Sequence, residues 1–247
     1  MSRKKPTATL LFDLDGTLVD TDALHLKAYN TLLQTFDRHI DEDYYKTYVM
    51  GFSNDEIMRK LFPAESSSKH TQYANQKEEI VRSLFTDLTP APGLLELLQR
   101  AELFCCRIAV VTNAPRQNAE LLLSGLGLRD RFKTVVLGEE LTHGKPHPLP
   151  YLTALELLGA RAESAFAFED SYSGVKSASS AGLRTFGLLT SLPESKLLEA
   201  GAVRAIRNFL DPTMRAMLYP LFDVEAPELD EYISADRKDL AESAHDD

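Results

Sequence analysis

Two aspartates that end an apolar stretch are the side chains of this 247-residue chain whose types and spacing first suggest chemistry. The stretch 7–12, TATLLF, is apolar and β-favouring without strict alternation, which is typical of a strand buried on both faces of a parallel sheet. Asp13 and Asp15 follow two residues apart, so both carboxylates point to one side while the backbone stays extended, and Gly16 lets the chain turn sharply. Two negative charges are therefore expected at the carboxyl end of a strand.

Like charges placed this close favour a cation between them, and open α/β sheets bind ligands at the carboxyl ends of their strands. We therefore predict a Mg²⁺ site in which Asp13 is a carboxylate nucleophile and Asp15 transfers protons. The plain alternative is a turn in which Asp and Gly only end a strand. A calcium loop of the EF-hand type needs Glu at its twelfth position, where this chain has Leu24.

Polar residues also follow two later apolar stretches. Thr112 and Asn113 end the stretch 107–112, where their side chains and backbone N–H groups can hold phosphate oxygens or simply cap the next helix. Lys145 lies in the short loop GKPHP, in which two prolines restrict the backbone and so fix its ammonium group. A phosphate-binding lysine is expected there.

A second pair of acids, Glu169 and Asp170, follows the apolar stretch 165–168 and repeats the pattern of the first. Acids at two separate strand ends suggest one shared cation. His143 and His147 have the spacing of metal ligands, but the prolines of their loop exclude the helix that would align them. His25 is either an ordinary surface or core histidine or part of the site.

The elements that must position these residues follow an alternating pattern in the second half of the chain. Strands are expected at 107–112, 134–137, 165–169 and 184–188, with a weak one at 203–206, and helices at 94–101, 117–126, 149–158 and 174–181. This alternation predicts an α/β fold with a doubly wound parallel sheet. Between the first and second strands the pattern is helical only, with helices at 22–36, 54–61 and 71–85 and an exposed loop at 65–69.

We therefore predict a catalytic core of residues 1–19 and 91–221 and a small inserted helical domain of residues 20–90. Asp22 is the expected cap of the first inserted helix, and the proline-rich stretch 89–93 is the expected hinge back to the core. Residues 222–247 carry ten acids against Arg237 and Lys238, which accounts for most of the formal charge of −10. This acidic tail is expected to be partly disordered.

Composition excludes several classes of function. The body of the chain is nearly neutral, so it offers no basic surface for nucleic acid, and no stretch is long and apolar enough to cross a membrane. The basic N-terminus is followed by only a short apolar run, which argues against a signal peptide and for a cytoplasmic protein. The two cysteines, Cys105 and Cys106, are adjacent and are expected to be buried thiols. A monomer or a weak homodimer is expected.

In this order the motifs resemble those of the haloacid dehalogenase (HAD) superfamily of phosphotransfer enzymes. The stretch DLDGT at 13–17 is similar to its first motif, Thr112 to its second, Lys145 to its third and the pair at 169–170 to its fourth. The inserted helices resemble the α-helical cap of the family, and the stretch 20–25, DTDALH, resembles the approach to that cap in β-phosphoglucomutase-like members. The resemblance is strongest to sugar-phosphate phosphatases of that branch.

The resemblance implies a Mg²⁺-dependent phosphatase that acts on small phosphorylated metabolites through an aspartyl-phosphate on Asp13. It implies that Asp15 protonates the leaving alcohol and then activates water. The family's ligands for Mg²⁺ correspond to Asp13, the backbone carbonyl of Asp15, and Asp170, with Glu169 in or beside the coordination shell. Its phosphate-binding residues correspond to Thr112, Asn113 and Lys145, and the cap residues most tied to specificity to His25 and Asn54.

Four alternatives stay open at this point. Two use the same site on another substrate, as a β-phosphoglucomutase-like phosphotransferase or a phosphoglycolate phosphatase. Mutases of the branch carry a lysine and an arginine where this chain has Met50 and Asn54, which favours hydrolysis. A dehalogenase has no leaving alcohol for Asp15 to protonate. A phospho-accepting signalling module would leave the inserted helical domain unexplained.

Overall fold

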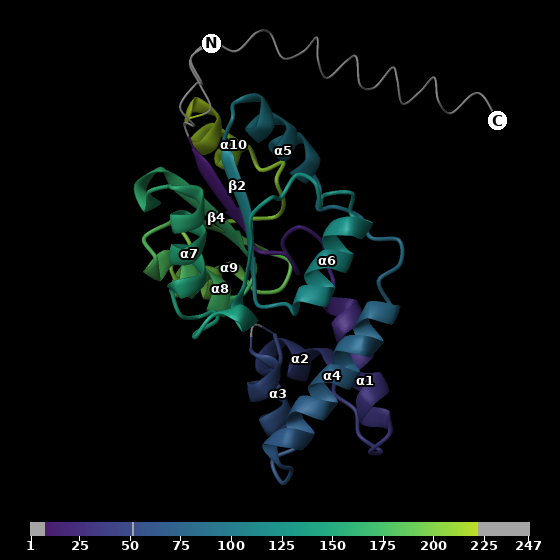
Figure 1. Cartoon of the computed structure of the whole chain (residues 1–247). Coiled ribbons are helices and arrows are strands. Elements are labelled where there is room, and N and C mark those ends of the chain that lie inside the picture. Colours follow the sequence, from purple (N-terminus) through teal and green to yellow (C-terminus); the bar gives the residue numbers. More distant parts are fainter. Residues whose placement is uncertain (1–7, 51, 222–247) are drawn as a thin grey trace, which may run out of the picture.

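The structure is a computed structural model that describes residues 8–50 and 52–221. Its centre is a six-stranded sheet in which every pairing is parallel, with the order β3-β2-β1-β4-β5-β6 (Figure 1). The strands are β1 (Thr9–Phe12), β2 (Arg107–Thr112), β3 (Val135–Leu137), β4 (Ala165–Glu169), β5 (Arg184–Leu188) and β6 (Arg204–Ile206). Because β1 lies between β2 and β4, the ends of the strands that carry the polar motifs are neighbours.

The two faces of the sheet differ in the size of their side chains. One face carries rings, among them Phe12, Phe168 and Phe186, and the opposite face carries small residues such as Ala109 and Ala167. This follows from the alternation of side chains along each strand. The helices of the ring face are α5 (Leu94–Leu103), α6 (Arg116–Gly125) and α10 (Pro212–Leu218). Those of the other face are α7 (Leu149–Leu158), α8 (Tyr172–Ser180) and α9 (Glu194–Ala200).

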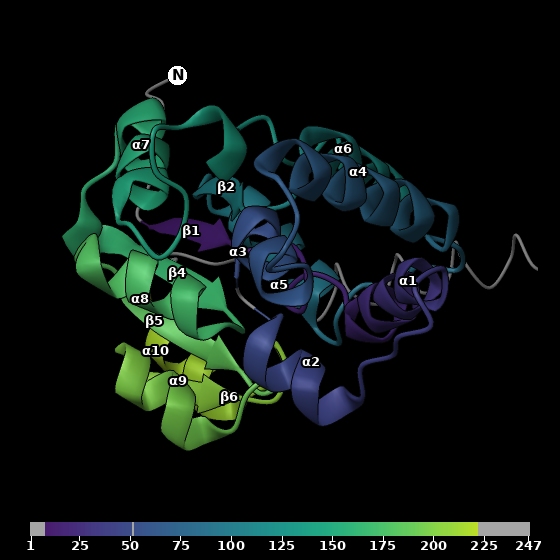
Figure 2. The same cartoon turned by 90° about the horizontal axis from the view of Figure 1, so that it is seen from below.

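Four further helices form a separate body below the carboxyl edge of the sheet (Figures 1 and 2). They are α1 (Asp22–Gln34), α2 (Glu42–Tyr48), α3 (Asn54–Leu61) and α4 (Ser67–Ser83), and we refer to them together as the cap. The cap has an apolar core of its own, built around residues such as Tyr29, Leu33, Met58 and Tyr73. The cap as a whole lies over the strand ends that carry the acidic motifs.

The doubly wound α/β fold predicted from the sequence is confirmed, and the strands lie within one or two residues of the predicted ranges. The boundaries in the cap were less accurate. Helix α4 starts at Ser67, because Ser66 accepts a hydrogen bond from the N–H of Lys69, so most of the predicted loop 65–69 is helical. Helix α2 was not predicted at all, although Asp41 caps it.

Three smaller expectations were also wrong. Thr21, not Asp22, is the N-cap residue of α1, and α1 ends at Gln34 rather than at residue 36. Cys105 is exposed and Cys106 is only partly buried.

The predicted acidic tail at 222–247 lies outside the described residues. Within the described residues, no helix combines the length and the apolar character that crossing a membrane requires.

Candidate active site

The two aspartates of the first motif leave β1 and contact different partners. The N–H of Asp13 donates to the carbonyl of Phe168, which continues the pairing of β1 with β4 by one residue. The Asp13 carboxylate contacts Lys145, whereas Asp15 accepts a hydrogen bond from the Thr21 hydroxyl at 2.6 Å. The two carboxylates therefore contact different side chains, Lys145 in the case of Asp13 and Thr21 in the case of Asp15.

Lys145 lies between two carboxylates. Its Nζ is 2.5 Å from Asp13 Oδ1 and 2.5 Å from Glu169 Oε1, and its side chain is almost fully buried. The main chain of Lys145 is held by Asn113, whose Nδ2 donates to the Lys145 carbonyl while its Oδ1 accepts the Lys145 N–H, both at 3.1 Å. The amide of Asn113 therefore braces the lysine loop.

The acids of the fourth motif are held by hydroxyl groups. Tyr151 of α7 donates to Glu169 Oε1, and Ser191, in the loop after β5, contacts Asp170 Oδ2. Ser191 Oγ also lies 2.9 Å from Oδ2 of Asp22 in the cap. Neither hydroxyl was singled out from the sequence. The periodicity of α7 could have indicated that Tyr151 lies on the buried face of that helix. The loop that contains Ser191 carries no recognisable pattern.

Burial dominates the electrostatics of this cluster. It raises the pKa of Asp13 to about 8, although the charge of Lys145 opposes that rise. Burial also raises the pKa of Asp170 well above its ordinary value, and the nearby charges of Asp13 and Glu169 add to the effect. The single ammonium group of Lys145 therefore does not fully offset the cost of burying the carboxyl groups of Asp13, Glu169 and Asp170.

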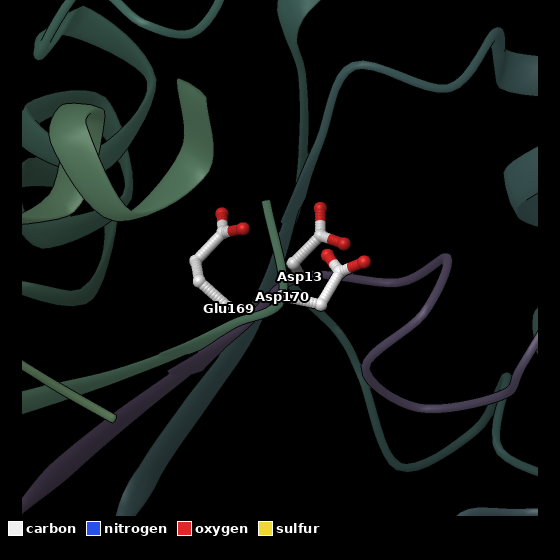
Figure 3. Close-up of side chains that lie close together, drawn as sticks. All are labelled: Asp13, Glu169 and Asp170. Atoms are coloured by element: carbon white, nitrogen blue, oxygen red, sulfur yellow. The ribbon is translucent and has the colours of Figure 1, made fainter. Parts of the chain in front are cut away.

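The chemistry of these donors fits a divalent cation. Asp13, Glu169 and Asp170 each offer a carboxylate oxygen, and the three atoms lie within 4.8 Å of one another (Figure 3). Glu169 Oε2 is buried without a hydrogen-bond partner, so this cluster has an unused acceptor. Gly16 has a φ of +73°, and a Cβ there would lie 2.1 Å from Asp170 Oδ2, so only glycine leaves space beside that carboxylate. Hard, charged oxygen donors of this kind are the ones that Mg²⁺ prefers.

The cap reaches Asp15 through His25, which lies on α1. His25 Nε2 is 3.3 Å from Asp15 Oδ1, and His25 Nδ1 is 2.8 Å from the Nζ of Lys77 on α4. Because an ammonium group can only donate, Nδ1 is the acceptor and Nε2–H faces Asp15. Burial alone would raise the pKa of Asp15, but the hydrogen bonds from His25 and Thr21 hold it below its ordinary value.

The structure places Asn54 on the carboxylate of Glu78, to which its Nδ2 donates at 2.8 Å. Glu78 is buried and also accepts a hydrogen bond from Lys77. His25 and Asn54 were predicted from the sequence, but Lys77 and Glu78 were not. A buried Lys-Glu pair cannot be distinguished by sequence pattern from the exposed charges that surround it on α4.

A cavity of about 1130 Å³ connects the core motifs with the cap. The core contributes all the predicted site residues except Glu169, and the cap contributes side chains from all four of its helices. The lining includes Asp13, Asp15, Thr112, Asn113, Lys145 and Asp170 from the core, and Asp22, His25, Tyr45, Asn54, Lys77 and Glu78 from the cap. Glu169 contacts Lys145 but is not part of this lining.

Comparisons with known proteins agree with this arrangement. The model of the haloacid dehalogenase-like hydrolase family matches residues 10–188. The phosphorylated carbohydrates phosphatase of Thermotoga maritima is 34% identical over 202 residues, which cover 80% of this chain and 93% of that protein. Protein CbbY of Rhodobacter capsulatus is 34% identical over 188 residues, covering 71% of this chain and 82% of that protein.

Solved structures show the same similarity. CbbY of Rhodobacter sphaeroides in complex with phosphate has a TM-score of 0.73 at 28% identity, covering 83% of this chain and 95% of that one. A CbbY variant of the same organism in complex with xylulose-(1,5)bisphosphate has a TM-score of 0.73 at 27% identity, with the same coverage. The matched region includes every motif from Asp13 to Asp170. This chain belongs to the haloacid dehalogenase-like hydrolases.

Proposed function

We propose that this protein is a Mg²⁺-dependent phosphatase that hydrolyses small sugar monophosphates through an aspartyl-phosphate on Asp13. The observation that carries the proposal is the position of the Asp13 carboxylate. It is buried, it contacts the ammonium group of Lys145, and it lines a cavity shared by core and cap. The phosphorylated carbohydrates phosphatase of Thermotoga maritima, at 34% identity, supports the substrate class.

In the first step, Asp13 Oδ attacks phosphorus and the bond to the leaving oxygen breaks, while Asp15, which takes up a proton as the negatively charged phosphate approaches, gives that proton to the leaving oxygen. In the second step, Asp15 takes a proton from water, the water oxygen attacks phosphorus, and the Asp13 carboxylate is released with inorganic phosphate. A carboxylate and a phosphate repel each other by about 4 kcal/mol per charge pair at ~4 Å and an effective dielectric constant near 20. Lys145 offsets this repulsion, and Thr112 lines the same cavity.

Mg²⁺ would be held by Asp13, by Asp170 and by the backbone carbonyl of Asp15, with Glu169 next to them. The bound ion would supply positive charge to the phosphoryl oxygens. Asn113 acts through its brace on Lys145. His25 orients Asp15 through the Nε2–H contact. The cap covers the strand ends and thereby excludes water while the ester is cleaved (Figure 2).

The charges of the cap favour a substrate with one phosphate. Among its described residues that line the cavity, Lys77 is the sole lysine or arginine, and its ammonium is engaged by His25 and Glu78. Arg59 pairs with Asp55, and Lys60 stacks on Phe52 at 3.3 Å, so neither cation lines the cavity. A second phosphate would find no available cation among these cap residues, although Lys176 of the core lines the same cavity, and this lack of cap cations favours hydrolysis over mutase chemistry.

Phosphorus NMR on β-glucose 1-phosphate with a trace of the bisphosphate tests this proposal. We expect inorganic phosphate to grow faster than glucose 6-phosphate with Mg²⁺, and no reaction with excess EDTA. Faster growth of glucose 6-phosphate would show a mutase. If the enzyme is assayed with a wider panel of sugar phosphates and phosphoglycolate and releases phosphate only from phosphoglycolate, the assignment of a sugar substrate is wrong.

Cytoplasmic location and a monomeric or weakly dimeric state stay predictions.

A further inference from the structure

The side chain of Asn118 connects the core to the cap. Asn118 lies on α6 and is 1% exposed, and its Nδ2 donates to Glu78 Oε2 of α4 at 2.6 Å. Its Oδ1 accepts a hydrogen bond from Arg82 Nη1, also of α4, at 3.1 Å. Both polar atoms of this buried amide are therefore used by one cap helix, at the place where α4 passes α6 (Figure 2).

The other oxygen of Glu78 faces into the cap. Glu78 Oε1 accepts hydrogen bonds from Lys77 Nζ at 2.9 Å and from Asn54 Nδ2 at 2.8 Å. The Glu78 carboxylate therefore accepts hydrogen bonds from side chains of three helices, α3, α4 and α6. From Lys77 the contacts continue through His25 to Asp15, so an uninterrupted series of hydrogen bonds joins Asn118 to the proton-transferring carboxylate.

We propose that Asn118 and Glu78 are positioning residues, which lock α4 against the core so that Lys77 holds His25, and through it Asp15, in the geometry for proton transfer. This inference rests on the proposed function, because it assigns Asp15 the proton. Nothing in the sequence analysis pointed to Asn118, which stands in an ordinary amphipathic helix.

The physical case is one of directional constraint. The long stem of Lys77 has many rotamers, and its ammonium is directed by two acceptors, His25 and Glu78. Glu78 is in turn directed by Asn118, which belongs to the core and so does not move with the cap. A displacement of about 1 Å at a reacting group can cost about 100-fold in rate, so a lock of this kind has a measurable effect.

An exchange of the two groups tests the lock. Asn118→Asp places two carboxylates against each other and Glu78→Gln places two amides there, whereas the double variant restores the hydrogen bond with donor and acceptor exchanged. In the double variant the Gln carbonyl still accepts from Lys77 and Asn54, and Arg82 gains a carboxylate. We expect Asn118→Asp to lower kcat/KM for a sugar phosphate about tenfold or more, and the double variant to recover most of that loss.

The same variants are assayed with p-nitrophenyl phosphate, whose nitrophenolate leaves without being protonated. Because kcat/KM reports on the first step, in which this leaving group needs no proton, a lock that acts through Asp15 spares the kcat/KM of this substrate. The kcat/KM for the sugar phosphate divided by that for p-nitrophenyl phosphate therefore falls in Asn118→Asp and returns in the double variant. A merely structural role would lower both substrates equally and leave the ratio unchanged, and that outcome would overturn the proposal. No recovery in the double variant would overturn it as well.

Glu79→Gln is the matched control, since Glu79 is exposed on the same helix and should leave both rates unchanged. If Asn118→Asp is not obtained folded, Asn118→Ala is measured for the same ratio, and an unchanged ratio contradicts the lock. The proposed function fails separately, because it is wrong if the wild-type protein hydrolyses neither substrate with Mg²⁺. If the wild-type protein is active and the Asn118 variant keeps the same ratio of kcat/KM values, only the lock is refuted.

Discussion

At the scale of single residues, Lys145 has to serve two carboxylates at once. It contacts Asp13 and Glu169 at the same distance, and the tyrosine hydroxyl of Tyr151 also reaches Glu169. Glu169 thereby keeps the ammonium in place when a phosphate approaches Asp13. The nucleophile, its counter-charge and the support of that counter-charge therefore come from β1, from the loop before α7 and from β4.

Asp13→Asn should remove the chemistry and keep the fold. An amide is a poor nucleophile and a neutral metal ligand, so we expect turnover of sugar phosphates to fall at least about 1000-fold. Phosphate release measures the loss, and circular dichroism checks the fold. Retention of even a tenth of the wild-type turnover, with unchanged metal dependence, would show that another residue is the nucleophile.

The stabilisation that Mg²⁺ gives should depend on pH. The folded-state pKa of Asp13 is raised to about 8 from 3.8, so in the metal-free protein its contribution to stability is present below pH 3.8 and is lost as pH rises through about 8. A cation binds the ionised carboxylate, so we expect the gain in Tm from Mg²⁺ over EDTA to be larger at about pH 8 than at about pH 6.

Asp13→Asn provides the control for this measurement, because it removes the titrating group. Most of the difference between the two pH values should disappear in that variant. An equal gain in Tm at both pH values in the wild-type protein would contradict the assignment of Asp13 as a metal ligand.

At the scale of elements, the ring face of the sheet holds the strands that carry the acids. Phe168 stacks on Phe12 at 4.9 Å and on Phe186 at 5.5 Å, and all three side chains are fully buried. Asp13 follows Phe12 directly in the sequence, and Glu169 follows Phe168. The rings therefore fix the relative position of β1 and β4 at the point where the acids leave them.

Phe168→Ala should destabilise the protein by about 3 to 5 kcal/mol, because it leaves a cavity between two other rings. Urea unfolding followed by circular dichroism measures the change. Leu157→Ala on α7 is the matched control, since Leu157 is 65% exposed and its truncation should cost little. A loss below about 1 kcal/mol for Phe168→Ala would mean that the core closes around the gap.

Sequence reasoning succeeded where the topology of a parallel sheet brings residues together. The acids that follow β1 and β4 were expected to lie close together, because parallel strands end at one edge of the sheet, and Asp13, Glu169 and Asp170 do so in the structure. It failed for contacts that depend on how helices pack. Lys77 and His25 are 52 residues apart on two cap helices, and no periodicity specifies which of their faces meet. Helix α2 was missed because its four-residue stretch YYKT has weak helical propensity.

At the scale of the whole molecule, the cap and the core are joined by polar contacts on two sides of the cavity. Asn118 holds α4 on one side, and Ser191 contacts Asp22 of α1 on the other. The hydroxyl of Thr190, next to Ser191, donates to the carbonyl of Gly16 at 2.6 Å. The loop after β5 thereby contacts the first motif and the cap together.

Truncation after Leu221 should leave turnover unchanged. Every residue assigned to the site lies upstream of that point, and the removed residues carry mainly negative charge. Phosphate release from a sugar phosphate and the Tm of both chains provide the measurement. A loss of folding in the truncated chain would show that the removed segment packs on the body, and a lower KM would show that its charge repels the substrate.

The position of Ser191 also has a consequence for the stoichiometry of protons. Its hydroxyl has one hydrogen, but it lies within hydrogen-bonding reach of Asp170 and Asp22 at the same time. The second of these contacts needs a hydrogen from a carboxyl group, and burial raises the pKa of both aspartates. We therefore expect the metal-free protein to hold one more proton at the junction of cap and core, where Ser191 contacts both aspartates. A divalent cation bound to Asp170 would displace that proton, so cation uptake should acidify an unbuffered solution.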